Sequence, residues 1–135
     1  YNSSMNNLKV HHIGYLVKKL DKAKATFEAL GYKSGDITHD ETRGIDICFL
    51  KKDALNVELV APFTDESIVS GLMSRYKNSA YHICYESAHF NDDLHELENS
   101  GFHIIGEPLP APAIDGHNVV FLMNPAIGMI ELLET

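Results

Sequence analysis

Short apolar runs alternate with amphipathic segments along the chain, and this pattern occurs twice. Residues 8–17 and 80–85 are rich in β-branched and aromatic side chains, which is typical of strands. Residues 20–31 and 90–101 place apolar side chains at helical spacing and end on a glycine, so each predicts a short amphipathic helix. After each helix, paired apolar runs predict β-hairpins: 45–50 with 56–60, and 118–123 with 129–133.

A shift of 70 residues lays the first half of the chain on the second. It carries the HIGY segment at 12–15 onto HICY at 82–85, and Gly31 onto Gly101. The hairpin runs at 45–50 and 118–123 are aligned at a shift of 73, which indicates a duplicated structural unit. Each half is predicted to be a strand, a helix and three strands. We therefore expect an α+β fold made of two paired βαβββ modules.

These elements divide the chain into four segments. We expect a tail or expression remnant at 1–7, a first module at 8–62, a connector at 63–78 and a second module at 79–135. The chain has 135 residues, of which 44% are hydrophobic and 22% charged, so these segments fit one compact soluble domain.

The charge balance and the hydropathy restrict the partners. The 11 basic and 19 acidic residues give a net charge of -8, which disfavours a nucleic-acid surface. No apolar run approaches the roughly 20 residues that span a bilayer, and no secretory leader pattern precedes the fold. We expect a cytoplasmic protein without membrane contact, in which Cys48 and Cys84 are buried, reduced thiols.

Two histidines and two glutamates stand at matching positions of the two halves. Glu58 and Glu131 each interrupt an apolar strand, where a buried carboxylate needs a cation, hydrogen bonds or water. His12 and His82 occupy the same place in the first strand of each half. Imidazole and carboxylate ligands together suit Ni, Co, Zn, Mn or Fe(II). Each residue alone would be an ordinary structural or solvated side chain, but their repetition favours one divalent-metal site over a relic of duplication.

The chain resembles the vicinal oxygen chelate superfamily, which includes glyoxalase I, methylmalonyl-CoA epimerase, extradiol dioxygenases and bleomycin-resistance proteins. The segments that carry the resemblance are VHHIGYLVKKLDKAKATFEALGY, NVELVAP, AYHICYE and VVFLMNPAIGMIELLE. The resemblance implies curved mixed sheets that form a cup around a divalent metal ion, with Ni, Co, Zn or Mn as the expected cofactor. It assigns the ligands to His12, Glu58, His82 and Glu131. We also expect a homodimer, because curved sheets leave exposed edges.

The resemblance to glyoxalase I implies a lyase of the lactoylglutathione lyase type. Such an enzyme enolises a substrate held through vicinal oxygens, with Glu131 as the base and Glu58 as its alternate on the opposite face. The resemblance to methylmalonyl-CoA epimerase implies an isomerase instead, with a further carboxylate from Glu41 or Asp40. The expected substrate is accordingly a small thiol conjugate or an acyl-CoA.

A metal-free binding protein of the bleomycin-resistance type is the alternative from another functional class. Such proteins often carry Trp or other aromatic residues in the ligand cup, whereas this chain has no Trp and keeps all four ligand types. An extradiol dioxygenase is disfavoured because it needs two His and one carboxylate around Fe(II). The sequence therefore favours a metal-dependent lyase or isomerase.

Overall fold

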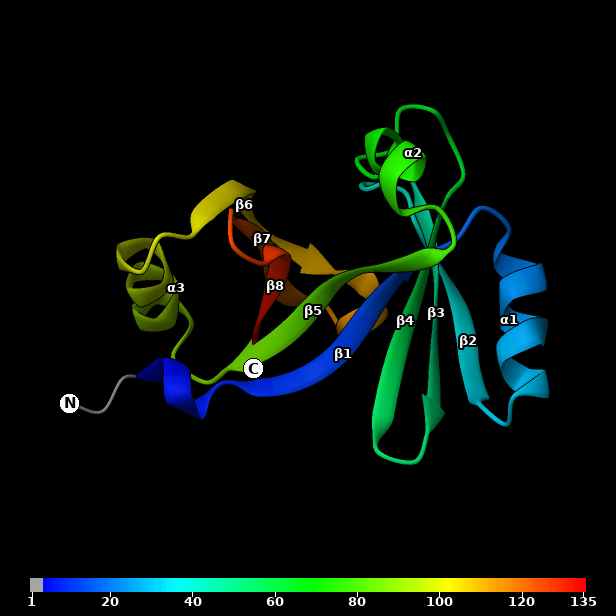
Figure 1. Cartoon of the computed structure of the whole chain (residues 1–135), viewed down its shortest axis with the longest axis horizontal. Coiled ribbons are helices and arrows are strands. Elements are labelled where there is room, and N and C mark those ends of the chain that lie inside the picture. The colour runs from blue at the N-terminus through cyan, green and yellow to red at the C-terminus, as the bar shows by residue number, and fades with distance from the viewer. Residues whose placement is uncertain (1–3) are drawn as a thin grey trace. The chain divides into compact units, whose positions relative to one another are not determined.

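The computed structural model describes residues 4–135, which divide into two units (Figure 1). One unit contains residues 12–81, and the other contains residues 82–135 together with the N-terminal segment as far as His11. The first three residues of the tail predicted at 1–7 lie outside the described part of the chain. The expected α+β fold with two βαβββ modules is confirmed.

The first module has the expected order of elements. β1 (Lys9–Leu16) and α1 (Leu20–Ala29) precede the strands β2 (Lys33–Asp40), β3 (Ile45–Lys52) and β4 (Leu55–Pro62). Their sheet has the order β2-β3-β4-β1, in which β1 runs parallel to β4 and the other neighbours are antiparallel. This mixed sheet places the first strand of the module beside its last.

Helix α1 covers one face of this sheet because its apolar side chains recur at helical spacing (Figure 1). Leu20, Ala23 and Phe27 pack against a buried core of Val17, Cys48, Leu50, Val57, Leu59 and Ala61. The ring of Phe27 meets Tyr15 and Tyr32 edge to face, with centroids 5.3 and 5.1 Å apart. Side chains that alternate with this core, among them His12 and Glu58, therefore point to the opposite face of the sheet.

The second module repeats this arrangement. β5 (Ser79–Ser87) and α3 (Phe90–Asn99) precede β6 (His103–Ala111), β7 (His117–Asn124) and β8 (Gly128–Glu134). The strand order is β5-β8-β7-β6, with β5 parallel to β8. Duplication of the sequence thus produces duplication of the topology.

The core beneath α3 also includes the N-terminal segment. Phe90 and Leu97 of the helix are buried against Val120, Leu122, Ile130 and Leu132. Met5 lies in a short 3-10 helix (Ser4–Asn7), and Leu8 directly follows it; both pack against the same core. Residues 4–11 therefore belong to the second unit, although β1 continues into the first.

The connector between the modules follows Pro62 and ends before β5. It contains a 3-10 helix (Ser70–Leu72) and the short helix α2 (Met73–Tyr76). Ser67 Oγ donates a hydrogen bond of 2.9 Å to the carbonyl of Arg43, in the turn between β2 and β3. Gly44 has φ +67°, and a Cβ there would lie 2.9 Å from Thr64 Cγ2. The connector is thus packed tightly on the β2–β3 turn.

Both cysteines are buried free thiols, as the sequence predicts. Burial raises the pKa of Cys48, which keeps its thiol protonated. None of the helices in the described part of the chain is both long and apolar enough to span a bilayer.

Candidate metal-binding pairs

His12 and Glu58 lie together on one face of the first module's sheet. In the parallel ladder Gly14 pairs with Glu58, so His12, two residues earlier on β1, points to the same face. His12 Nε2 lies 3.4 Å from Glu58 Oε1, and the two side chains are 0% and 7% exposed. The first module thus presents a buried imidazole nitrogen beside a buried carboxylate oxygen.

His82 and Glu131 form the corresponding pair in the second module. Cys84 pairs with Glu131 in the ladder between β5 and β8, which again places the histidine two residues upstream on the same face. His82 Nε2 lies 3.3 Å from Glu131 Oε1, and the side chains are 0% and 6% exposed. Distance and burial are nearly the same in the two modules, so the repetition seen in the sequence extends to side-chain geometry.

A phenylalanine ring packs on the histidine of each pair. Phe49 contacts His12 edge to face at a centroid distance of 5.2 Å, and Phe121 contacts His82 in the same way at 5.1 Å. Phe49 is the antiparallel partner of Glu58, and Phe121 is the partner of Glu131. Each pair is therefore part of a His, Glu and Phe triplet drawn from three adjacent strands.

The two phenylalanines correct the sequence alignment of the third strand in each module. Aligning 45–50 with 118–123 places Phe49 opposite Leu122, whereas the ladders make Phe49 equivalent to Phe121. The β3–β4 turn contains two residues between paired positions, and the β7–β8 turn contains three. The extra residue shifts the alignment by one, and a shift of one exchanges the faces of a strand. For this reason the sequence alignment does not identify Phe49 and Phe121 as equivalent residues.

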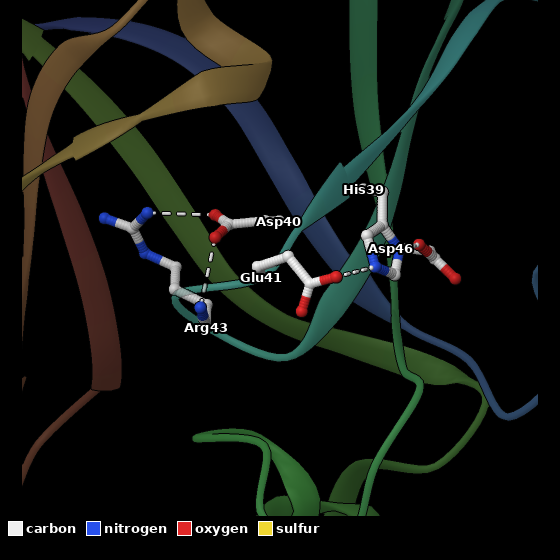
Figure 2. Close-up of polar contacts among 5 residues, drawn as sticks. All are labelled: His39, Asp40, Glu41, Arg43 and Asp46. Atoms are coloured by element: carbon white, nitrogen blue, oxygen red, sulfur yellow. Dashed lines mark hydrogen bonds and ion pairs between the residues drawn. The ribbon is translucent and has the colours of Figure 1, made fainter.

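Asp40 and Arg43 form a buried ion pair (Figure 2). The strand register places Asp40 on the same sheet face as Glu58. Asp40 is 1% exposed, and it accepts hydrogen bonds from the Arg43 backbone N–H at 3.0 Å and from Arg43 Nη1 at 2.9 Å. Both carboxylate oxygens of Asp40 are engaged by Arg43. Asp40 is therefore held as a fixed part of the turn.

Glu41 lies instead at an exposed cluster around His39, whose side chain points away from that of Asp40 (Figure 2). His39 Nε2 is 2.9 Å from Glu41 Oε1, and His39 Nδ1 is 2.6 Å from Asp46 Oδ1. Hydrogen bonds to Asp46 and then Glu41 raise the pKa of His39. Glu41 is 80% exposed, so the structure does not bring its carboxylate together with His12 and Glu58.

A family model matches residues 11–121 and is described as the Glyoxalase/Bleomycin resistance protein/Dioxygenase superfamily. The match covers most of the chain and includes His12, Glu58 and His82. The chain belongs to this superfamily.

One relative of this chain is the mitochondrial methylmalonyl-CoA epimerase of Bos taurus. It is 25% identical over 116 residues, which cover 84% of this chain and 66% of the relative. The chain thus spans slightly less than two thirds of the bovine protein. The cytoplasmic location expected from the sequence stays a prediction.

Two solved structures show the same fold. A hypothetical protein from Bacillus halodurans has a TM-score of 0.84 at 23% identity, covering 95% of this chain and 94% of that protein. A variant of Streptomyces coelicolor methylmalonyl-CoA epimerase in complex with 2-nitronate-propionyl-CoA has a TM-score of 0.81 at 20% identity. This match covers 94% of each chain.

Proposed function

We propose that this protein is a metal-dependent isomerase of the methylmalonyl-CoA epimerase type, which moves a proton at the α-carbon of an acyl-CoA. The observation that carries the proposal is the buried His–Glu pair, repeated in equivalent strands of both modules. The bovine relative favours an epimerase over a glyoxalase I. The comparisons support glyoxalase I only at the level of the superfamily.

The two pairs together supply the ligands for one divalent ion in this proposal. His12 and Glu58 come from the first module, and His82 and Glu131 come from the second. Two imidazoles with two carboxylates fit Ni, Co, Zn or Mn, and the carboxylates balance the charge of a divalent ion. This balance removes the cost of burying Glu58 and Glu131. When bound, the ion supplies stabilisation of negative charge on the substrate's carbonyl oxygen.

The glutamates have a second role in the proposal, because inversion needs proton transfer on both faces of the α-carbon. The carboxylate of Glu131 accepts the α-proton on one face. Glu58 passes a proton from water to the opposite face while Glu131 releases its own proton to water, and the reverse reaction exchanges these roles. The Phe49 and Phe121 rings pack edge to face on the imidazoles and help to hold them in place.

The proposal is tested by metal analysis of the purified protein together with proton exchange in deuterated buffer. We expect about one divalent ion per chain and deuterium incorporation at the α-carbon of methylmalonyl-CoA. Exchange only with the hemithioacetal of glutathione would replace the isomerase by a glyoxalase-type lyase. Absence of both metal and exchange, even after loading with Ni, Co or Zn, would indicate a binding protein.

Variants of the ligand residues separate metal binding from proton transfer. His12→Ala and Glu131→Gln are expected to lose metal and activity together while remaining folded by circular dichroism. Glu131→Asp keeps a carboxylate but moves it by one methylene, so it should lose far more turnover than metal. Equal losses in Glu131→Asp would leave this residue only a ligand role.

A further inference from the structure

Two methionines and a histidine lie side by side on the sheet of the second module. Met123 pairs with Met129 in the antiparallel ladder between β7 and β8, and His103 pairs with Met123 in the ladder between β6 and β7. Directly opposed residues of neighbouring strands point to the same face, with their Cβ atoms roughly 5 Å apart. His103, Met123 and Met129 thus form a row across three adjacent strands (Figure 1), called the thioether row below.

The core beneath α3 does not account for the thioether row. Ile104, Leu122 and Ile130, the chain neighbours of the three residues, contribute to that core. Strand alternation therefore sends the thioether row to the opposite face of the sheet. Both methionines of the row are half-buried and its histidine is exposed, so solvent reaches the row.

The first module shows that the fold does not require thioethers at these positions. The ladders that align the two phenylalanines also make Lys51 the counterpart of Met123, and Asn56 the counterpart of Met129. Lys33, which pairs with Lys51, takes the place of the histidine. A protonated lysine has no lone pair to offer a metal ion. The set of sulfur and nitrogen donors is therefore a property of the second module.

The donor atoms of the row suit a soft metal ion. The chain has 4 methionines, and two of them are direct cross-strand partners here. Thioethers are soft, uncharged ligands that select Cu(I), and imidazole also binds copper. The methionine side chain has three rotatable bonds, so both sulfur atoms can turn toward one ion. Two thioethers and one imidazole make a three-coordinate set for Cu(I).

We propose that the thioether row binds Cu(I) through Met123 Sδ, Met129 Sδ and a ring nitrogen of His103. This site differs in chemistry from the His–Glu pairs, whose nitrogen and oxygen donors suit divalent ions. The three ligands are neutral, so the ion keeps its single positive charge, and the exposed side of the row leaves that charge close to water. The net charge of -8 favours the approach of a cation. The inference does not depend on the proposed isomerase function.

The first test counts the bound ions of the full chain by isothermal titration calorimetry, with Ag+ as an air-stable probe of the same soft chemistry. Met123→Leu/Met129→Leu removes both sulfur atoms at nearly constant volume, so it should bind one Ag+ fewer than the wild type. The control Met5→Leu/Met73→Leu removes two thioethers elsewhere and should bind as many as the wild type. An unchanged count in Met123→Leu/Met129→Leu would overturn the proposal, because the ions would then bind at other residues.

Copper itself is tested on the wild-type chain, which avoids any effect of substitution on folding. Cu(I) is supplied under anaerobic conditions from a chelator, and the methionine methyl groups are observed by NMR after isotope labelling. The signals of Met123 and Met129 should shift, and those of Met5 and Met73 should stay in place. Bound Cu(I) that leaves the first two signals unshifted would overturn the copper site.

Single histidine variants separate this site from the proposed divalent site. His103→Gln should weaken Ag+ binding and keep the divalent metal, whereas His12→Ala should lose the divalent metal and keep Ag+. His12 is the cleaner control because His82 lies beside Met129 in the ladder between β5 and β8. Unchanged Ag+ affinity in His103→Gln, or loss of Ag+ in His12→Ala, would overturn a separate three-ligand site. A wild type that binds Ag+ at the row but no divalent ion would contradict the proposed function and retain the copper site.

Discussion

At the scale of single residues, the β2–β3 turn contains two carboxylates with opposite environments. Asp40 is buried and engaged by Arg43, whereas Glu41 is exposed at His39. They are adjacent in the sequence, but His39 and Asp40 point to opposite faces of β2, and Glu41 contacts His39. Their contributions to stability and activity should therefore differ.

Asp40→Ala leaves the Arg43 guanidinium buried without its carboxylate partner. We expect this to lower the free energy of unfolding by about 3 kcal/mol, measured by urea denaturation. Glu41→Gln is the matched control, because an exposed ion pair contributes about 0.5 kcal/mol or less. A similar loss in both variants would contradict the assignment of Asp40 as a structural anchor. Turnover of the Glu41→Gln variant also tests whether Glu41 is the additional carboxylate of an epimerase.

The His39 cluster predicts a pH dependence of stability. Asp46 and Glu41 raise the pKa of His39 above its ordinary value of 6.5, so the protonated form is favoured in the folded state. Its stabilising contribution is present in full below about pH 6.5 and is lost as the pH rises through the raised pKa. The urea midpoint of His39→Gln should therefore fall further below that of the wild type at acidic pH than at pH 9. A constant difference would contradict a charged role for His39.

At the scale of elements, the connector and the β2–β3 turn depend on each other at Gly44. Its positive φ favours glycine, and the approach of Thr64 and Ser67 leaves no room for a methyl group. Ser67 and Ile68 both donate hydrogen bonds to the carbonyl of Arg43, the preceding residue. The turn therefore positions the Asp40–Arg43 pair and anchors the connector.

Gly44→Ala should lower the free energy of unfolding by about 2–3 kcal/mol, from backbone strain together with a steric clash. Gly116→Ala is the control, because Gly116 has φ +77° but no neighbouring heavy atom within 4 Å of the place its Cβ would take. It should cost only about 1 kcal/mol of backbone strain. Equal losses in urea denaturation would show that the contact with the connector contributes nothing.

At the scale of the whole molecule, each module supplies one half of the proposed ligand set. A metal ion that binds only the folded chain stabilises it by mass action. Binding of one ion should therefore stabilise both modules, and neither His–Glu pair alone should bind the ion. The expected homodimer stays a prediction.

Chelation should lower the Tm of the wild type by several degrees, and readdition of metal should restore it. His12→Ala and His82→Ala should both abolish this response, although they lie in different modules. The measurement is differential scanning fluorimetry with and without EDTA. Retention of a metal-dependent Tm in either variant would contradict a site that needs both pairs.

The duplicated topology and the two His–Glu pairs could be predicted from the order of amino acids alone. Apolar periodicity predicts the strands and helices, because residues close together in the sequence set the spacing of apolar side chains on one face. His12, Glu58, His82 and Glu131 could be selected because each polar side chain interrupts an apolar strand at a repeated position. Pairing within each module then follows from the strand order.

Features that depend on register and on packing between distant segments emerge only in the folded chain. The extra residue in the β7–β8 turn makes Phe121 the counterpart of Phe49, which alignment of the apolar runs misplaces by one. The sequence does not distinguish Asp40 from Glu41, which the folded chain places in different surroundings. A groove beside the start of α1 likewise forms only when Tyr15, Phe27 and Asn78 come together. Turn length, strand face and long-range contact are set by folding, because local periodicity does not record them.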